Sequence, residues 1–491
     1  MTPKQLKASI LQLAIQGKLV PQDPNDEPAS ELLKRIEAAK DAKGAKKGKP
    51  LPPITDDEKL FNIPDSWVWV RLGDVCDFGK CESTFDSTID DSAWTLDLED
   101  IEKDTGNILQ RVRHINRRVK SVRHVFKKGQ VLFSKLRTYL NKVLIADEDG
   151  FCSSEIIPID FGTCINAGYA KCLLTSPLSL QYTSSCDYGV KMPRLGTEDG
   201  RHMPFPLPPL AEQKRIVAKV EVLFKYVDEC EDSRKQLAEK LAETLKRSVL
   251  QEAIQGRLVP QDPNDEPASE LLKRIAAERE KQIAEKKIKK PKPLPPITDD
   301  EKPFPIPGSW EWVRLGELVI AESGLSYKKE DLSVSRDEMV RVLRGGNILD
   351  GKYVFKEDDV FIAKEFAMKR PSIKAFDFVL PAVTSQEHLG KTALFEDDQP
   401  TAYAGGFLLM FHLLYHDQWI ARYLLAFFQS EQYHSYCKNI ANKSGQAFYN
   451  LSREKLCLTP IPIPPLAEQK RIVAKVDSLL AKIEEVRAAV C

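Results

Sequence analysis

Apolar residues recur in alternating steps of three and four along residues 210–253, a stretch that contains neither glycine nor proline. This spacing is typical of a helix with one packed seam, although Arg234 interrupts it. Pro208-Pro209 precede the stretch and Gly256 follows it, as expected at the start and stop of a helix. The pattern therefore predicts one helix roughly 65 Å long. The seam consists of Ile216, Val220, Leu223, Val227, Leu237, Leu241 and Leu245.

The two ends of the chain carry the same pattern in pieces. Residues 466–490 match the first half of this helix, and their seam runs from Ile472 to Val490. The N-terminal run, with Leu6, Ile10 and Leu13, matches the second half. Together the two ends rebuild most of a second copy of the central helix. The pattern predicts a two-fold, circularly permuted arrangement of paired helices.

Long segments of the chain are duplicated around these helices. Residues 16–36 recur almost unchanged at 255–275, 51–59 recur at 294–302, and 206–220 recur at 462–476. Such a long period indicates one large module present twice, and not a solenoid of short repeats. Between the duplicated parts lie divergent segments at 75–205 and 318–461, so the chain predicts two related but different globular domains on one duplicated scaffold.

The positions of the duplicated parts divide the chain into seven predicted segments. The central helix is assigned to 206–256, and the globular domains to 61–205 and 304–461. The terminal helical parts are 1–20 and 462–491, and charged, proline-rich connectors occupy 21–60 and 257–303.

Overall composition restricts the class of protein but not its partner. The 491 residues are 42% hydrophobic and 29% charged, so the chain can bury sizeable cores. Lys+Arg and Asp+Glu each number 72, which argues against a uniformly basic nucleic-acid coat protein. The ten cysteines include no C-x-x-C pair, the N-terminus lacks the features of a secretory signal, and no apolar run could span a bilayer. We expect a cytoplasmic protein with no membrane partner.

The charges are unevenly distributed within the first domain. Residues 111–142 contain eleven Lys and Arg residues and no acid, with aromatic and amide side chains among them, whereas many acids lie just upstream. Unbalanced bases favour a phosphate-binding face. The alternative is a surface on which the acids neutralise the bases. The DNA-binding candidates of this stretch are Arg111, Arg113, Arg117, Arg118, Lys120, Arg123, Lys135, Arg137, Tyr139, Asn141 and Lys142.

The second domain and two short loops add further DNA-binding candidates. Residues 189–195 and 445–451 share a glycine and a leucine six positions apart but differ between them. A shared frame with different tips suits two recognition surfaces for different sequences, whereas the alternative makes the glycine and leucine only turn and core. The stretch 131–135 is also aligned with 360–364, and 141–143 with 390–392. The added candidates are Lys191, Arg194, Lys364, Lys369, Arg370, Gln386, His388, Lys391, Gln446 and Asn450.

Motifs for catalysis or metal binding are missing from the sequence. Gly390-Lys391-Thr392 resembles the end of a phosphate-binding loop, but Ser385 stands where its first glycine should be. The chain has no Asn/Asp-Pro-Pro-aromatic run of an adenine methyltransferase, no H-E-x-x-H, no G-x-S-x-G and no zinc-spaced Cys/His array. We therefore expect no catalytic residue and no metal site.

Several duplicated motifs resemble those of the specificity subunits of type I restriction–modification systems. They are PLPPLAEQKRIV and PIPPLAEQKRIV, IPDSWVWVRLGD and IPGSWEWVRLGE, AIQGKLV and AIQGRLV, and the loop GQVLFSKLRTYLNKV. The resemblance covers nearly the whole chain. It implies a mixed α+β (α/β) fold in which two target-recognition domains are joined by long antiparallel conserved helices in a pseudo-two-fold, circularly permuted repeat.

The same resemblance implies a function and a set of partners. The chain would be non-catalytic and would recognise a bipartite, asymmetric site in double-stranded DNA. It would dock two modification (methyltransferase) subunits that bring S-adenosylmethionine, and two restriction subunits that bring ATP- and Mg-dependent activity. The chain itself would hold no cofactor. Two alternatives remain open from the residues alone, a coiled-coil scaffold without DNA binding and a fused restriction or methylation enzyme.

Overall fold

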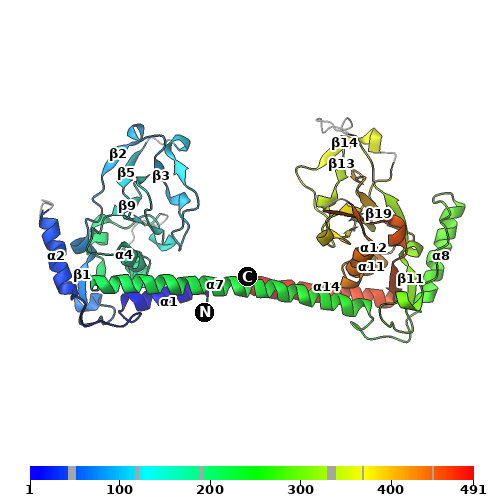
Figure 1. Cartoon of the computed structure of the whole chain (residues 1–491), viewed down its shortest axis with the longest axis horizontal. Coiled ribbons are helices and arrows are strands. Elements are labelled where there is room, and N and C mark those ends of the chain that lie inside the picture. The colour runs from blue at the N-terminus through cyan, green and yellow to red at the C-terminus, as the bar shows by residue number, and fades with distance from the viewer. Residues whose placement is uncertain are drawn as a thin grey trace. The chain divides into compact units, whose positions relative to one another are not determined.

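The computed structural model describes residues 1–42, 51–117, 121–186, 192–328, 339–367, 370–444 and 447–490. The chain forms two compact units, Met1–Ser233 (unit 1) and Arg234–Cys491 (unit 2). A single helix, α7 (Leu210–Ile254), contributes its first half to unit 1 and its second half to unit 2 (Figure 1). The helix expected over 210–253 is therefore confirmed.

Unit 1 pairs the first half of α7 with the N-terminal helix α1 (Pro3–Ile15), as Figure 1 shows. The buried face of α1, which includes Ile10 and Ile15, belongs to the same core as Ile216 and Val220 of α7. Thr2 caps the start of α1 through its hydroxyl, which accepts a hydrogen bond from the Gln5 backbone N–H.

Unit 2 repeats this pairing with the other end of the chain. The C-terminal helix α14 (Leu466–Val490) lies along the second half of α7, and Ile472 and Val476 share a core with Leu250 and Ile254. In unit 1, α1 takes the place that the second half of α7 takes in unit 2. In unit 2, α14 takes the place that the first half of α7 takes in unit 1. The predicted completion of the helix pairs by the two termini is confirmed within each unit.

A buried glutamate joins each helix pair to its globular domain. In unit 1, Glu212 of α7 accepts hydrogen bonds from the Trp67 indole N–H at 2.9 Å and the Gln22 amide at 2.5 Å. In unit 2, Glu468 of α14 accepts the equivalent bonds from Trp310 at 2.9 Å and Gln261 at 2.5 Å. Burial raises the pKa of both carboxyl groups, against the opposing effect of these hydrogen bonds.

A two-stranded antiparallel ribbon then leads into and out of each domain. It consists of β1 (Val68–Arg71) and β10 (Pro204–Leu207) in unit 1, and of β11 (Glu311–Arg314) and β22 (Pro460–Ile463) in unit 2. Arg71 is buried and donates two hydrogen bonds to Glu58, and Arg314 does the same to Glu301. These bonds lower the pKa of Glu58 and of Glu301 to about 2.

The unit 1 domain contains a five-stranded sheet, β2-β5-β8-β3-β4, and a three-stranded sheet, β7-β6-β9. In the larger sheet β3 and β8 are parallel, and the other neighbours are antiparallel. The strands are β2 (Ser83–Phe85), β3 (Trp94–Leu96), β4 (Val112–Arg113), β5 (Val122–Phe126), β6 (Val131–Ser134), β7 (Val143–Ile145), β8 (Gly150–Ser153) and β9 (Ile156–Ile159). The helices beside α1 and α7 are α2 (Ala29–Ala42), α3 (Leu72–Val75), α4 (Ala167–Leu174), α5 (Pro177–Cys186) and α6 (Thr197–His202).

The unit 2 domain has the orders β12-β19-β15-β17, β14-β13-β18 and β16-β21-β20. Here β13 and β18 are the parallel pair. The strands are β12 (Val319–Ser323), β13 (Met339–Leu343), β14 (Val360–Ala363), β15 (Asp377–Pro381), β16 (Val383–Thr384), β17 (Ala393–Phe395), β18 (Ala402–Ala404), β19 (Leu408–Leu413), β20 (Asn442–Ser444) and β21 (Phe448–Asn450). The helices are α8 (Ala268–Ala284), α9 (Leu315–Leu318), α10 (Lys364–Ala367), α11 (Gln418–Phe428), α12 (Glu431–Ile440) and α13 (Arg453–Cys457).

Strand order shows which parts of the two domains correspond. Strand β6 lies between β7 and β9, and β15 lies between β17 and β19. Each follows a turn residue with positive φ, Gly129 at 88° and Phe376 at 66°. Residues 131–135 therefore correspond to 378–382, and their expected alignment with 360–364 is wrong because β14 pairs with β13 instead. Both domains share a parallel strand pair with an antiparallel neighbour (β8-β3-β4 and β18-β13-β14) and the order β7-β6-β9 or β17-β15-β19, although their sheets are otherwise divided differently. This shared part confirms the predicted duplication of a mixed α+β domain.

Candidate nucleic-acid interface

The β6–β7 loop of unit 1, residues 135–142, presents one aromatic side chain on a fixed backbone. Arg137 and Asn141 both adopt the left-handed conformation at φ 51°, on either side of a short 3₁₀ turn. The Asn141 amide donates a hydrogen bond to the Thr175 carbonyl at 3.1 Å and is almost fully buried. Tyr139, between them, is 53% exposed. Left-handed non-glycine residues cost about 1–3 kcal/mol each and persist where the surroundings impose them, often at binding sites.

The loop before Leu195 packs directly against this β6–β7 loop. Leu136 and Arg194 form an antiparallel bridge, and the Leu195 N–H donates to the Lys135 carbonyl at 2.9 Å. Leu195 is buried, whereas Arg194 is exposed and forms a two-bond ion pair with Glu155 at 2.8 and 3.2 Å. The leucine is thus a core anchor, and the polar tip stands beside the β6–β7 loop as a recognition surface would require.

Unit 2 builds the same frame with other side chains. Val383 pairs with Asn450, and the Leu451 N–H donates to the Ala382 carbonyl at 2.8 Å. Leu451 is buried like Leu195. Gly390, at φ 88°, stands where Asn141 stands in unit 1, after the 3₁₀ turn Gln386–His388. Asn450 therefore corresponds to Arg194.

The structure places Lys142 and Lys391, two of the DNA-binding candidates, next to buried groups of their domains. Lys142 donates to the Leu98 carbonyl at 2.6 Å, and burial lowers its pKa, so its charge is partly used inside the domain. Lys391 precedes strand β17, and Thr392 beside it is fully buried with its hydroxyl bonded to the Gly390 carbonyl at 2.9 Å. A phosphate-binding loop requires a helix after this lysine and threonine, so the structure agrees with its rejection.

Acids neutralise the start of the basic run. Arg111 donates to Asp147 and Glu148 at 2.7 Å each and lies over the Trp94 ring, with 4.2 Å between the guanidinium carbon and the ring centroid. Arg113 also pairs with Glu148, at 2.5 Å. At Arg111 and Arg113 the structure therefore favours the alternative of a neutralised surface, although the acids come from residues 147–148 and not from the upstream segment.

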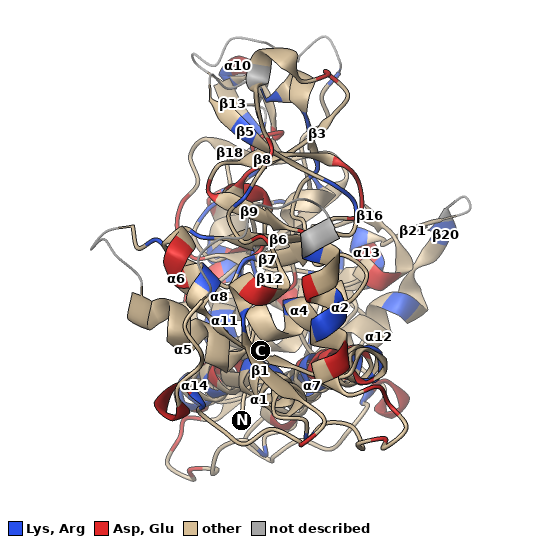
Figure 2. Cartoon of the chain, turned by 90° about the vertical axis from the view of Figure 1, so that its left-hand side faces the viewer, with Lys and Arg blue, Asp and Glu red and all other residues tan. Residues whose placement is uncertain are grey.

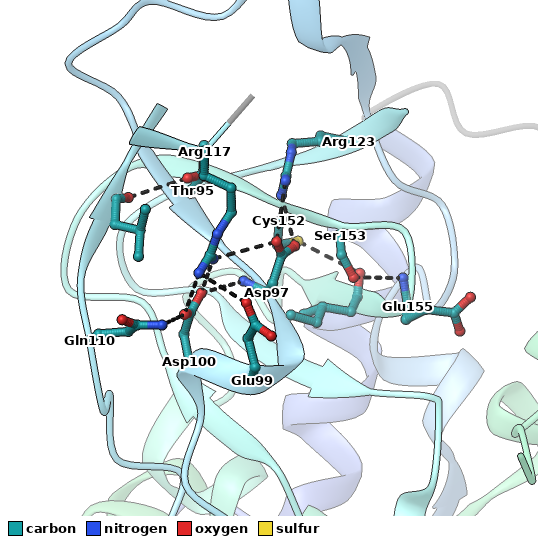
Figure 3. A network of polar contacts seen from close by, with 12 residues as sticks. Thr95, Asp97, Glu99, Asp100, Gln110, Arg117, Arg123, Cys152, Ser153 and Glu155 are labelled. Carbon is teal, nitrogen blue, oxygen red and sulfur yellow. Dashed lines mark hydrogen bonds and ion pairs between the residues drawn. The ribbon is translucent and has the colours of Figure 1, made fainter. Parts of the chain in front are cut away.

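Figure 3 shows the same outcome for Arg117 and Arg123, which meet an acidic cluster of Asp97, Glu99 and Asp100. Arg117 forms ion pairs with all three acids, and Arg123 pairs with Asp97 at 2.9 Å. Burial alone would raise the pKa of Asp100, but its hydrogen bonds, above all from Arg117, lower it. Arg123 is 1% exposed, so this side chain is part of the core and not of a phosphate-binding surface.

The other candidates lie on the surface or outside the described residues. Lys364, Arg370, Gln386 and His388 are exposed, and Lys135 and Arg137 are half-buried. Figure 2 shows Lys and Arg positions together with Asp and Glu positions over the described strand-rich regions. The candidates outside the described residues are Arg118, Lys120, Lys191, Lys369 and Gln446.

A groove between two helices offers a different kind of surface. In unit 2, α7 and α14 enclose a space of about 490 Å³ lined by apolar side chains. Several of these side chains are well exposed, including Leu237 at 67%, Leu241 at 52% and Val486 at 62%. Exposed apolar patches of this kind commonly mark sites where another chain packs.

Structural candidates for metal binding or membrane crossing are absent from the described ranges. No group of three or more His, Cys, Asp or Glu side chains there could hold a metal ion. No described helix is both long enough and apolar enough to cross a membrane.

Some residues of structural importance were not recognised from the sequence. Glu155 and Phe407 occupy equivalent positions, since their carbonyls accept from the Lys135 and Ala382 N–H groups, and neither belongs to a motif. Tyr169 and Tyr423 each donate to a proline carbonyl of the exit strand at 2.6 Å, and both lie in divergent segments. Trp67 and Trp310, by contrast, lie in duplicated motifs, and an identical tryptophan in both copies indicates a contact that the two domains share.

Comparison with known proteins agrees with this architecture. Residues 64–241 and 307–489 each match the family model "Type I restriction modification DNA specificity domain". The chain is 31% identical to the type I restriction enzyme EcoAI specificity subunit of Escherichia coli, over 97% of this chain and 89% of that protein. It is 30% identical to the EcoEI specificity subunit of the same species, over 99% and 90%. The solved HsdS subunit from Thermoanaerobacter tengcongensis is 21% identical, with a TM-score of 0.38 over 88% of this chain and 94% of that one.

These matches decide between the interpretations left open by the residues. A coiled-coil scaffold without DNA binding and a fused catalytic enzyme both lose their support, since the matched proteins are specificity subunits and two specificity domains account for most of this chain. The chain belongs to the family of type I restriction–modification specificity subunits, non-catalytic proteins with two target-recognition domains that act in DNA recognition.

Proposed function

We propose that unit 1 and unit 2 each recognise one half of a bipartite, asymmetric sequence in double-stranded DNA. The observation that supports this is one loop frame with different tips, with Arg194 beside Glu155 in unit 1 and Asn450 in unit 2. Sequence is recognised through hydrogen bonds and apolar contacts to base edges, so different side chains on one frame favour different bases.

The proposed DNA contacts are narrower than the sequence candidates. Arg117 and Arg123 are left out because the acidic cluster uses them, and Arg111 and Arg113 because residues 147–148 do. In unit 1 the proposed contacts are Lys135, Arg137, Tyr139 and Arg194, which we keep despite its pairing with Glu155 because it is exposed and bridges the β6–β7 loop. In unit 2 they are Lys364, Arg370, Gln386, His388, Lys391 and Asn450.

The helix pairs have two proposed roles. A rigid helix such as α7 transmits both length and rotational phase, as does DNA between two half-sites, so α7 would set the distance between the half-sites. The apolar groove at Leu241 supports docking of a helix from a methyltransferase subunit, and the duplicated scaffold supports a second such subunit. We assign S-adenosylmethionine to these partners, and ATP and Mg to two restriction subunits. The complex would act on DNA in the cytoplasm.

An exchange of recognition tips tests the proposed function. Residues 190–194 of the full chain are replaced by the sequence of 446–450, and the methylation sites of the complex with its methyltransferase are mapped. We expect the half-site of unit 1 to change and that of unit 2 to stay the same. A matched control is Lys18→Arg, which makes residues 16–36 identical to residues 255–275 and should change neither half-site. If both half-sites stay the same after the exchange, these loops do not determine the sequence.

A further inference from the structure

The turn between β18 and β19 in unit 2 displays an unusually exposed aromatic side chain, Phe407, which is 74% exposed. The turn itself is tightly held. A Cβ on Gly405 would lie 2.6 Å from the Leu343 carbonyl oxygen, so the backbone packs closely against the neighbouring strand. The Phe407 carbonyl accepts a hydrogen bond from the Ala382 N–H at 2.8 Å. The ring is thus exposed on a fixed backbone and not on a loose loop.

Phe407 has a defined counterpart in unit 1. The Glu155 carbonyl accepts from the Lys135 N–H at 3.0 Å, which is the same bond that Phe407 makes with Ala382. The Glu155 side chain reaches Arg194 at 2.8 Å, so side chains at these two positions meet. By this correspondence Phe407 and Asn450 hold the equivalent two positions in unit 2.

The chemistry of the pair changes completely between the units. Unit 1 has an acid and a base that form an ion pair, and unit 2 has an aromatic ring and an amide. Phe448, two residues before Asn450 on β21, adds a second exposed ring at 56% exposure. In a β-strand, residues two apart lie on one face, so Phe448 and Asn450 share a face of β21. Exposed apolar side chains that gather on one surface commonly mark a site where a partner binds.

An amide and an apolar group match the two edges of one base pair in the major groove. Asn pairs with adenine through N6 and N7, and an apolar side chain contacts the thymine methyl group. We propose that Phe407 and Asn450 together recognise an A·T pair in the half-site of unit 2, with Asn450 on the adenine and the Phe407 ring against the thymine methyl group. This inference rests on the proposed function, which assigns a half-site to unit 2.

The test is a mutant cycle between the protein and the DNA. The full chain is assembled with its methyltransferase, and binding is measured on duplexes in which each thymine of the mapped unit 2 half-site is replaced in turn by uracil, which lacks the methyl group. At one position we expect wild-type affinity to fall about fourfold, the effect of about one lost methyl contact. The Phe407→Ala variant should be insensitive to the same replacement.

Two further variants complete the test. Asn450→Ala should relax the preference for adenine at the partner base of that thymine. Leu60→Ala, which removes another exposed apolar side chain (53% exposed) far along the sequence, should keep the full uracil effect. Phe407 is mostly exposed, so its truncation should leave the thermal transition unchanged.

The failure of this inference differs from the failure of the proposed function. If unit 2 specifies a half-site but no thymine shows coupling to Phe407, or the half-site has no thymine on either strand, the A·T assignment is overturned and the proposed function stands. If exchange of the tips alters neither half-site, these loops do not determine the sequence, and the observation that supports the proposed function is lost.

Discussion

The two units share their frame down to single hydrogen bonds and differ where side chains leave the frame. Trp67 with Glu212 in unit 1 repeats as Trp310 with Glu468 in unit 2, with the same 2.9 Å distance between indole nitrogen and carboxylate oxygen. At the loop tips, by contrast, Arg194 is replaced by Asn450. The frame has to fit the same helix pair in both units, whereas the tips have to fit different partners.

The divergence also extends into the domain interior. Asp100 and Asn347 hold equivalent places, since each accepts a hydrogen bond from the backbone N–H three residues before it, at 2.8 and 2.7 Å. Both are almost fully buried. Unit 1 places a buried carboxylate there, neutralised by Arg117, whereas unit 2 places an amide there that donates to the Val354 carbonyl at 3.0 Å and to the buried Asp359 carboxylate at 2.5 Å. One frame therefore tolerates two different electrostatic solutions.

The largest expected effect comes from removing the arginine that neutralises Asp100 in unit 1. Arg117→Ala should destabilise unit 1 by about 3–5 kcal/mol, because it leaves the buried Asp100 carboxylate without its counter-charge. Hydrogen exchange of unit 1 amides measures the loss. The double variant Arg117→Ala/Asp100→Asn removes the buried charge together with its partner and places the amide of unit 2 at this position, so it should recover most of the loss. A double variant as unstable as the single one would contradict this account of the cluster.

The next effect should be equal in the two units. Glu212→Ala leaves the buried Trp67 indole N–H without an acceptor, at a cost of about 1–3 kcal/mol to unit 1. Glu468→Ala does the same to Trp310, so we expect the same loss in unit 2, again measured by hydrogen exchange. Glu→Gln at either site keeps an acceptor and should cost less. Losses that differ by more than about 1 kcal/mol between the units would show that the two junctions are not equivalent.

Much of the frame could be predicted from the sequence because it is periodic or duplicated. The seam of α7, the completion of the helix pairs by the termini, and Leu195 with Leu451 all follow from spacing and repetition. The fate of Arg123 could not be predicted, because only the fold brings Asp97 to it. The same holds for Glu155 and Phe407, whose equivalence depends on one backbone hydrogen bond in each unit. Local sequence cannot distinguish a basic run that faces solvent from one that the chain covers with acids.

A smaller effect, common to both units, appears in acid. The pKa of Glu58 and of Glu301 is lowered to about 2 by hydrogen bonds from Arg71 and Arg314. A lowered folded-state pKa gives stability that is present above the ordinary pKa near 4.5 and is lost as the pH falls toward 2. Both glutamates keep about a third of their surface in solvent, so screening limits the effect to about 1 kcal/mol in each unit. Thermal transitions between pH 6 and pH 3 should fall less in Glu58→Gln and Glu301→Gln than in the wild type, and an unchanged acid dependence would contradict this.

The smallest expected effect is a loss of stability in unit 2 as the pH rises above about 6.5. In unit 2, His412 Nδ1 lies 2.7 Å from the buried Asp377 carboxylate. Burial opposes a charged ring, but the hydrogen bond and charge of Asp377, with a contribution from Glu322, outweigh it and raise the pKa of His412. A raised folded-state pKa gives stability that is fully present below about pH 6.5 and is lost as the pH rises through the folded-state value. Unit 1 has Gln130 in place of Asp377, because the backbone N–H of Lys127 bonds Gln130 as that of Lys374 bonds Asp377.

Unit 2 should therefore lose up to about 1 kcal/mol between pH 6 and pH 9 through the His412–Asp377 pair, which unit 1 lacks. Hydrogen exchange of each unit over this range measures the difference, and two-dimensional NMR of the histidine ring measures its pKa directly. His412→Gln keeps a hydrogen-bond donor toward Asp377 but cannot titrate, so it should remove the pH dependence of unit 2 and leave unit 1 unchanged. If the stability of unit 2 changes with pH to the same extent in wild type and His412→Gln, the His412–Asp377 pair does not distinguish the two units. Any difference between the units in their pH dependence would then come from surface residues.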